Sequence, residues 1–376
     1  MSGYWVVLGF VVACWSVAYV GTRAVARWLD EAFDGPELAG ALRGLRRVGY
    51  AVVTAAVLAG WRVVDGDGVV ADGLTAADAP AVLGSPSAVA AVQTAAVVVV
   101  ALGSAWLGGV LAVALATVSY RRRSREYELT HRFVLRWLLS RGGGSVVGVG
   151  VAALVVSTVP AGVPRLAAVL ALAAGTMLVL PYTLTVALRA RPATPVERRV
   201  VADVLPDDVT LRVVDDRTRI GPAFAAGTPP GPEYVFVTAA VFDVCTDAAV
   251  RAVVAHEVAH HRHRHVAVRF ATVAAGILPV LVAVEFGLEL PAWSLLVSVP
   301  YVLGVAWVFR RTEFAADAAA ARAVGSGALV AAFDALVEQR LVLTGTGSWL
   351  SLFAVHPTIA ARKRRLDGLT VRKTAT

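Results

Sequence analysis

Long apolar runs recur along this sequence and are separated by short polar stretches. A helix needs about 20 mainly apolar residues to cross the hydrocarbon core of a bilayer. The chain is 57% hydrophobic and only 16% charged, against about 45–50% and about 25% in soluble domains. We therefore expect a mainly α-helical, multispanning membrane protein with about seven transmembrane helices. The predicted spans are roughly Tyr4–Gly21, Val48–Val64, Ala88–Ser119, Val146–Pro160, Leu166–Leu188, Val266–Leu288 and Pro291–Phe309.

The positions of the arginines predict how these spans are oriented. The first and third loops are rich in arginine, whereas the second loop, from Asp65 to Ser87, has acidic residues and no Lys or Arg. Because basic loops stay on the cytoplasmic side, we expect a multi-pass protein of the cell membrane with its N-terminus outside. Residues 189–265 and 310–376 are then cytoplasmic. The arginines concerned are Arg23, Arg27, Arg43, Arg46 and Arg47, and Arg121 to Arg123, Arg125, Arg132, Arg136 and Arg141.

The net charge of +8 does not indicate a nucleic-acid partner. The basic residues lie at the ends of the apolar runs and are not interleaved with aromatic residues, which is typical of membrane topology and not of a nucleic-acid surface. We therefore expect contacts with the lipid bilayer and no binding of nucleic acid.

One short motif carries chemistry: His256-Glu257-Val258-Ala259-His260. On a helix, residues four apart lie on one face, so His256 and His260 can hold one zinc ion together. Glu257 then lies beside the metal and can take a proton from the attacking water. This motif predicts the core of a zinc metallopeptidase site.

The third zinc ligand has to come from another part of the chain. A catalytic zinc usually has three protein ligands. His263 is excluded as the third, because it lies about 10 Å along the helix from His256, too far for both to bind one metal ion. The seventh span returns the chain to the same membrane face at Glu313 and Asp317, which lie four residues apart. We predict Glu313 as the ligand, with Asp317 behind it to accept the ring N–H of a ligand histidine. No metal is assigned to the remaining histidines of this region, His261, His263 and His265.

The polar stretch before the motif can form a small soluble fold. Residues 209–214, 223–226 and 234–238 read as three strands, and we expect them to form a short antiparallel sheet. The motif helix follows, with Thr246 or Asp247 as its N-cap, and is expected to continue into the sixth span. The expected divisions are a five-span region at 1–190, a catalytic part at 191–265, a transmembrane hairpin at 266–309 and a second catalytic part at 310–376.

Together these motifs resemble the HtpX and CAAX-prenyl-protease type of membrane zinc metallopeptidases, which are gluzincins. The resemblance covers about Leu211 to Leu366 and has four parts in the same order. They are the edge strand Ala223-Phe-Ala-Ala-Gly227, the His256 to His260 motif, the Glu313-x-x-x-Asp317 motif, and His356-Pro357 with the downstream Arg362. HtpX types have four spans, and the CAAX prenyl protease has seven, with five before the motif and two after it, as expected here.

The resemblance implies further roles. Ala223, Phe224 and Ala225 would bind an extended peptide by strand addition, and His356 would help to stabilise the tetrahedral oxyanion. Arg362 would support the site together with Asp317. Pro222 stands where the family usually has Asn, so the details of the substrate groove stay open.

The prediction is therefore a membrane endopeptidase with one zinc ion per chain, acting on peptide or protein substrates at the cytoplasmic face with Glu257 as general base. Two alternatives are a signalling or sensor protease with one cytoplasmic target, and a non-catalytic zinc-containing membrane scaffold. Substrate identity, any prenyl group on the substrate, the oligomeric state and an enclosed chamber between the spans stay open.

Overall fold

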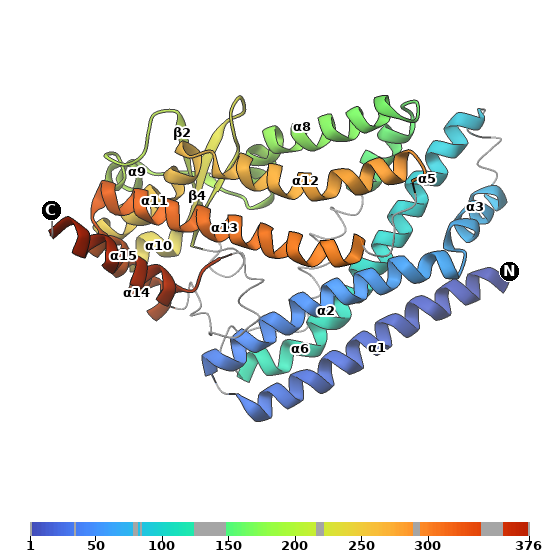
Figure 1. Cartoon of the computed structure of the whole chain (residues 1–376), viewed down its shortest axis with the longest axis horizontal. Coiled ribbons are helices and arrows are strands. Elements are labelled where there is room, and N and C mark those ends of the chain that lie inside the picture. The colour runs from blue at the N-terminus through green and yellow to red at the C-terminus, as the bar shows by residue number, and fades with distance from the viewer. Residues whose placement is uncertain are drawn as a thin grey trace. The chain divides into compact units, whose positions relative to one another are not determined.

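The computed structural model describes residues 2–33, 35–77, 82, 85–123, 148–215, 222–288, 294–339 and 356–374. The protein is mostly helical and has one small sheet (Figure 1). It divides into two compact units, Met1–Val169 and Leu170–Thr376. These two units do not test the four divisions expected from the sequence, which stay a prediction. Arg125, Arg132, Arg136 and Arg141 lie outside the described residues.

The first unit consists of apolar helices that pack against one another. Its core lies between α1, α2 and α6, where Val57 and Val113 are fully buried. A π-helical segment interrupts the third predicted run, and the indole of Trp15 donates a hydrogen bond to the carbonyl of Ser104 at its start (3.0 Å). The elements are α1 (Ser2–Ala32), α2 (Gly35–Val63), α3 (Gly66–Ala76), α5 (Pro86–Gly103), η1 (Ser104–Val110), α6 (Leu111–Arg123) and a helix at Gly148–Ser157.

Several of the described helices could cross a bilayer by length and composition. Three do so alone, and two further pairs, bent by 65° and 118°, bring the number to five if each pair forms one span. The protein is therefore a membrane protein by these criteria, but the seven expected spans are not confirmed. The three are Gly3–Ala32, Val163–Ala187 and His265–Ala283, and the pairs are Gly40–Trp61 with Gly66–Ala76 and Pro300–Val324 with Ser326–Glu338.

The second unit places a sheet and several helices around one core. Val235 and Val237 from the sheet pack with Val254 of α11, Leu329 of α14 and Leu366 of α15. The elements in chain order, with α8 beginning in the first unit, are α8 (Val163–Ala187), β1 (Arg191–Pro192), α9 (Pro195–Val200), β2 (Val209–Val214), β3 (Ala223–Ala226), β4 (Glu233–Thr238), α10 (Ala239–Val244), α11 (Asp247–Arg262), α12 (His265–Glu285), α13 (Ser294–Val324), α14 (Ser326–Glu338) and α15 (Ile359–Thr374).

The sheet is mixed, so the expected purely antiparallel sheet is wrong. Its order is β1-β2-β4-β3; β3 runs antiparallel to β4, whereas β2 runs parallel to it. Burial explains the order, because Tyr234 to Thr238 of β4 are all buried while Ala223 to Ala225 of β3 are only half-buried. The most buried strand, β4, therefore lies in the interior of the sheet. In chain order, the edge strand β3 follows β2, and β4 then lies between them. The predicted strand positions agree with β2, β3 and β4.

The motif helix does not continue into the sixth span, which corrects another expectation. α11 ends at Arg262, and Arg264 has a left-handed φ of 52°, which interrupts the helix before α12 begins at His265. The seventh predicted run behaves in the opposite way. α13 is one helix of 31 residues that continues past Phe309 through Glu313 and Asp317.

Candidate active site

The two motif histidines lie on a buried helix. Thr246 caps α11, since its side chain accepts a hydrogen bond from the N–H of Ala249 (3.3 Å). From there the helix packs into the core, and His256 and His260 are only 7% and 4% exposed. Their Nε2 atoms lie 3.3 Å apart. Both ring nitrogens therefore point to one small volume.

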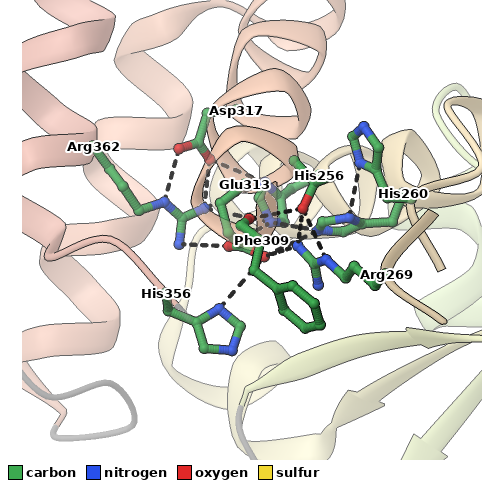
Figure 2. Close-up of polar contacts among 10 residues, drawn as sticks. His256, His260, Arg269, Phe309, Glu313, Asp317, His356 and Arg362 are labelled. Atoms are coloured by element: carbon green, nitrogen blue, oxygen red, sulfur yellow. Dashed lines mark hydrogen bonds and ion pairs between the residues drawn. The ribbon is translucent and has the colours of Figure 1, made fainter. Parts of the chain in front are cut away.

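Glu313 of α13 completes this volume (Figure 2). Its Oε2 lies 3.7 Å from His256 Nε2, and its Oε1 lies 3.5 Å from His260 Nε2. Tetrahedral ligands at bond lengths of about 2.0–2.2 Å lie about 3.3–3.6 Å from one another. The separations of 3.3 and 3.5 Å fall in this range, and the 3.7 Å between Glu313 Oε2 and His256 Nε2 lies just above it. These residues can therefore surround a zinc-sized cation. Within the described ranges, they are the one group of three side chains close enough to hold a metal ion.

Asp317 lies directly behind His256. Its Oδ1 is 3.0 Å from His256 Nδ1, and it accepts a further hydrogen bond at Oδ2 from Arg362 Nε (2.8 Å). A hydrogen bond of this kind fixes the tautomer and the ring orientation of a metal ligand. The structure thus places Asp317 behind His256, as expected from the sequence, and also pairs Arg362 with Asp317, which the sequence did not predict. The roles of both residues stay predictions.

Two further residues contact the predicted ligands and were not identified from the sequence. His265 Nδ1 lies 3.0 Å from His260 Nδ1, so it can accept the Nδ1–H of His260 when Nε2 faces a metal. Arg269 donates to Glu313 Oε1 (2.7 Å). His265 reaches the site only because the chain turns at Arg264. Arg269 did carry a signal, since a charged residue inside an apolar run is costly and marks a functional position.

The remaining predicted residues are Glu257, His356 and three residues of β3. Glu257 is 8% exposed on α11. The side chain of His356 is 63% exposed, and its Nδ1 lies 3.4 Å from Glu313 Oε1. Ala223, Phe224 and Ala225 lie on β3, at the edge of the described sheet, and β3 contacts α11. The structure therefore brings all of the predicted catalytic and metal-binding residues together.

Burial and charge alter the acidity of the α11 groups. Burial raises the pKa of Glu257, although His256 opposes this. Burial and Arg362 lower the pKa of His256, but Asp317 and Glu313 outweigh them and raise it to about 9. Burial and His256 lower the pKa of His260. A carboxylate with a raised pKa is a better proton acceptor near neutral pH than an ordinary glutamate.

Comparison with known proteins decides the family. Residues 196–370, which contain the whole of this site, match the sequence profile of peptidase family M48. This segment is a peptidase family M48 domain. The resemblance to membrane metallopeptidases of the HtpX and CAAX-prenyl-protease type is thereby confirmed, and so is the expected metalloprotease class. This family implies a metal, and His256, His260 and Glu313 are the residues that could hold it.

One curated protein and one solved structure are also similar to this chain. A protein described as a protease HtpX homolog, from Aeropyrum pernix, is 33% identical over 151 residues, which cover 37% of this chain and 46% of that protein. The chain thus matches about half the length of this relative. The crystal structure of S. mikatae Ste24p is similar with a TM-score of 0.64 at 14% identity, over 98% of this chain and 99% of that chain. At this identity the likeness shows a shared fold.

Proposed function

We propose that this protein is a zinc-dependent membrane endopeptidase that cleaves membrane or membrane-associated proteins at the cytoplasmic face. The observation that carries the proposal is the group formed by His256, His260 and Glu313, whose ligand atoms lie within 4.8 Å of one another, with the buried Glu257 on the same helix as the two histidines. The arginine-rich first and third loops support the cytoplasmic side.

In this proposal, His256, His260 and Glu313 hold one zinc ion per chain. Zinc bound there supplies Lewis acidity, which polarises the scissile carbonyl and lowers the pKa of water. The carboxylate of Glu257 accepts the proton of the attacking water and later passes it to the leaving amine nitrogen. Asp317 keeps the ring of His256 oriented, and Arg362 holds Asp317.

The edge strand β3 is the proposed peptide-binding element. An edge strand offers backbone N–H and C=O groups to an extended peptide, which then adds to the sheet. Pro222 has no N–H, and its carbonyl is already used, because it accepts hydrogen bonds from the N–H (2.9 Å) and Oγ1 (3.1 Å) of Thr238. Hydrogen-bonded pairs alternate along an antiparallel ladder, so the backbone groups of Pro222 and Phe224 face β4, whereas those of Ala223 and Ala225 face the open edge and would pair with a substrate. His356, exposed beside Glu313, is the proposed oxyanion donor.

The decisive experiment replaces the proposed general base. Glu257→Gln keeps the size of the side chain and removes its ability to accept a proton. We expect the purified variant to bind one zinc ion per chain and to lose at least about 100-fold in cleavage of an unfolded membrane protein. Glu338→Gln, on the exposed end of α14, is the control and should cleave like wild type.

Cleavage by Glu257→Gln at the wild-type rate would contradict the mechanism. A wild-type protein that binds zinc but cleaves neither unfolded protein nor prenylated peptide would instead favour the zinc-containing scaffold. Cleavage of one cytoplasmic protein and no unfolded substrate would favour the signalling protease.

A further inference from the structure

Arg269 contacts two neighbouring residues of α13 at once. Its Nη2 donates to Glu313 Oε1 (2.7 Å), and its Nε and Nη2 donate to Thr312 Oγ1 (2.8 and 2.6 Å). The Thr312 hydroxyl in turn donates to the carbonyl of Phe309 (2.7 Å). The guanidinium also lies 5.1 Å from the centre of the Phe309 ring. Four contacts therefore determine the position and the plane of this cation.

Packing between α12 and α13 supports this contact. The hydroxyl of Tyr301 on α13 lies 2.7 Å from the carbonyl of Thr272 and 3.0 Å from that of Val273 on α12. A Cβ atom at Gly276 would lie 2.1 Å from Cζ of the Tyr301 ring, so the helices approach closely because Gly276 has no side chain. This close packing fixes the register of the hairpin, and with it the reach of Arg269 to Glu313.

We propose that Arg269 is a positioning residue for zinc, which holds the carboxylate of Glu313 in the orientation that faces His256 and His260. This inference rests on the zinc site proposed above. Glu313 is only 3% exposed, so the carboxylate oxygen that does not bind the metal needs a donor inside the protein. Arg269 donates to Oε1, which leaves Oε2, 3.7 Å from His256 Nε2, as the oxygen for the metal. The planar fork of an arginine can hold that oxygen and Thr312 together.

Other groups near Glu313 are less suited to this role. His356 is largely exposed and lies 3.4 Å from Oε1, and Arg362 lies 3.8 Å from Oε2 while it is held by Asp317. Figure 2 shows Arg362 and Arg269 on opposite sides of Glu313. Each proposed ligand thus has its own supporting group: Asp317 for His256, His265 for His260, and Arg269 for Glu313.

The test measures zinc affinity of the purified full-length protein by competition with a chelator. Arg269→Gln removes the charge and the fork, whereas Arg269→Lys keeps the charge but cannot hold Thr312 and Glu313 with one planar group. We expect both variants to bind zinc about 10–100-fold more weakly than wild type. Arg311→Gln is the control, since the Arg311 guanidinium lies over the Trp307 ring, and its zinc affinity should stay within about twofold of wild type.

Unchanged or tighter zinc binding by Arg269→Gln would overturn the proposal. Weak binding by the Gln variant with normal binding by the Lys variant would also overturn it, because charge and not orientation would then be the cause. If Arg269→Gln does not fold, two other variants replace it. Arg269→Lys and Thr312→Val, which removes the hydroxyl that accepts from the guanidinium, should then bind zinc more weakly than wild type, and unchanged zinc binding by both would overturn the proposal. A wild-type protein that binds no zinc would instead refute the proposed function itself, which this assay detects separately.

Discussion

Asp317→Asn tests both how much a buried ion pair stabilises the fold and whether Asp317 supports metal binding by His256. The chain provides a matched control in a second, exposed ion pair. Arg362 and Lys363 are neighbours on α15, and each pairs with one aspartate. The pair with Asp317 is buried, with side-chain exposures of 12% for Arg362 and 3% for Asp317. The pair with Asp334 is open to solvent, with exposures of 28% for Lys363 and 62% for Asp334.

The two substitutions should therefore differ in their cost. Removing one partner of a buried ion pair costs about 3–5 kcal/mol, because the other charge stays buried without compensation. The amide of Asn still offers an acceptor to His256 Nδ1, so we expect the lower end, about 3 kcal/mol of unfolding free energy. Asp334→Asn should cost no more than about 1 kcal/mol. Asp317→Asn should also weaken zinc binding about 10–100-fold, since His256 loses its charged partner.

Both quantities can be measured on the protein purified in detergent. Thermal unfolding with zinc removed gives the stability difference, and competition with a chelator gives the zinc dissociation constant. Equal losses of stability in Asp317→Asn and Asp334→Asn would refute the burial argument. Unchanged zinc affinity in Asp317→Asn would refute the role of Asp317 in orienting His256.

Two further predictions concern the fold around the site. Arg191 lowers the pKa of Glu197 from 4.5 to about 2, so this pair stabilises the fold above about pH 4.5 and its contribution is lost as the pH falls toward 2. Glu197→Gln should therefore lower the unfolding free energy by about 1 kcal/mol at pH 6, a value reduced because Arg191 is 34% exposed. The difference in unfolding free energy from wild type should vanish near pH 2. A difference that stays constant with pH would contradict the prediction. Gly227 has a φ of 98°, and a Cβ atom there would lie 1.9 Å from the carbonyl oxygen of Pro232, so Gly227→Ala should cost more than about 1 kcal/mol. Gly368→Ala, on α15 with open space around it, should be neutral or slightly stabilising by the same thermal measurement.

Much of the site could be predicted from the sequence because helical spacing is a local property. If the segment is helical, His256 and His260 lie on one face whatever the tertiary structure. Glu257 was predicted as the general base because it lies between them in the motif. The prediction of Glu313 and Asp317 required one further step, the expectation that the seventh span returns the chain to the same membrane face. Strand positions also followed from local patterns, and β2, β3 and β4 lie where they were expected.

The pairing of those strands was not predictable in the same way. Residues 209–214 and 234–238 have similar apolar patterns, and neither pattern states which strand is central. The answer depends on which surfaces cover them, and β4 is central because it is buried on both faces. The left-handed conformation of Arg264 had no sequence signal of its own, since arginine rarely adopts it.

The sequence by itself determined the apolar helices, the chemistry of the motif and the family to which residues 196–370 belong. Only the tertiary structure decided the supporting contacts, because they join side chains that are not related by any helical or strand period. Arg269 and Glu313 are 44 residues apart, and His265 meets His260 across a helix break. Spacing along one helix places the proposed zinc ligands of α11, whereas the packing of α12 against α13 places Arg269 beside Glu313.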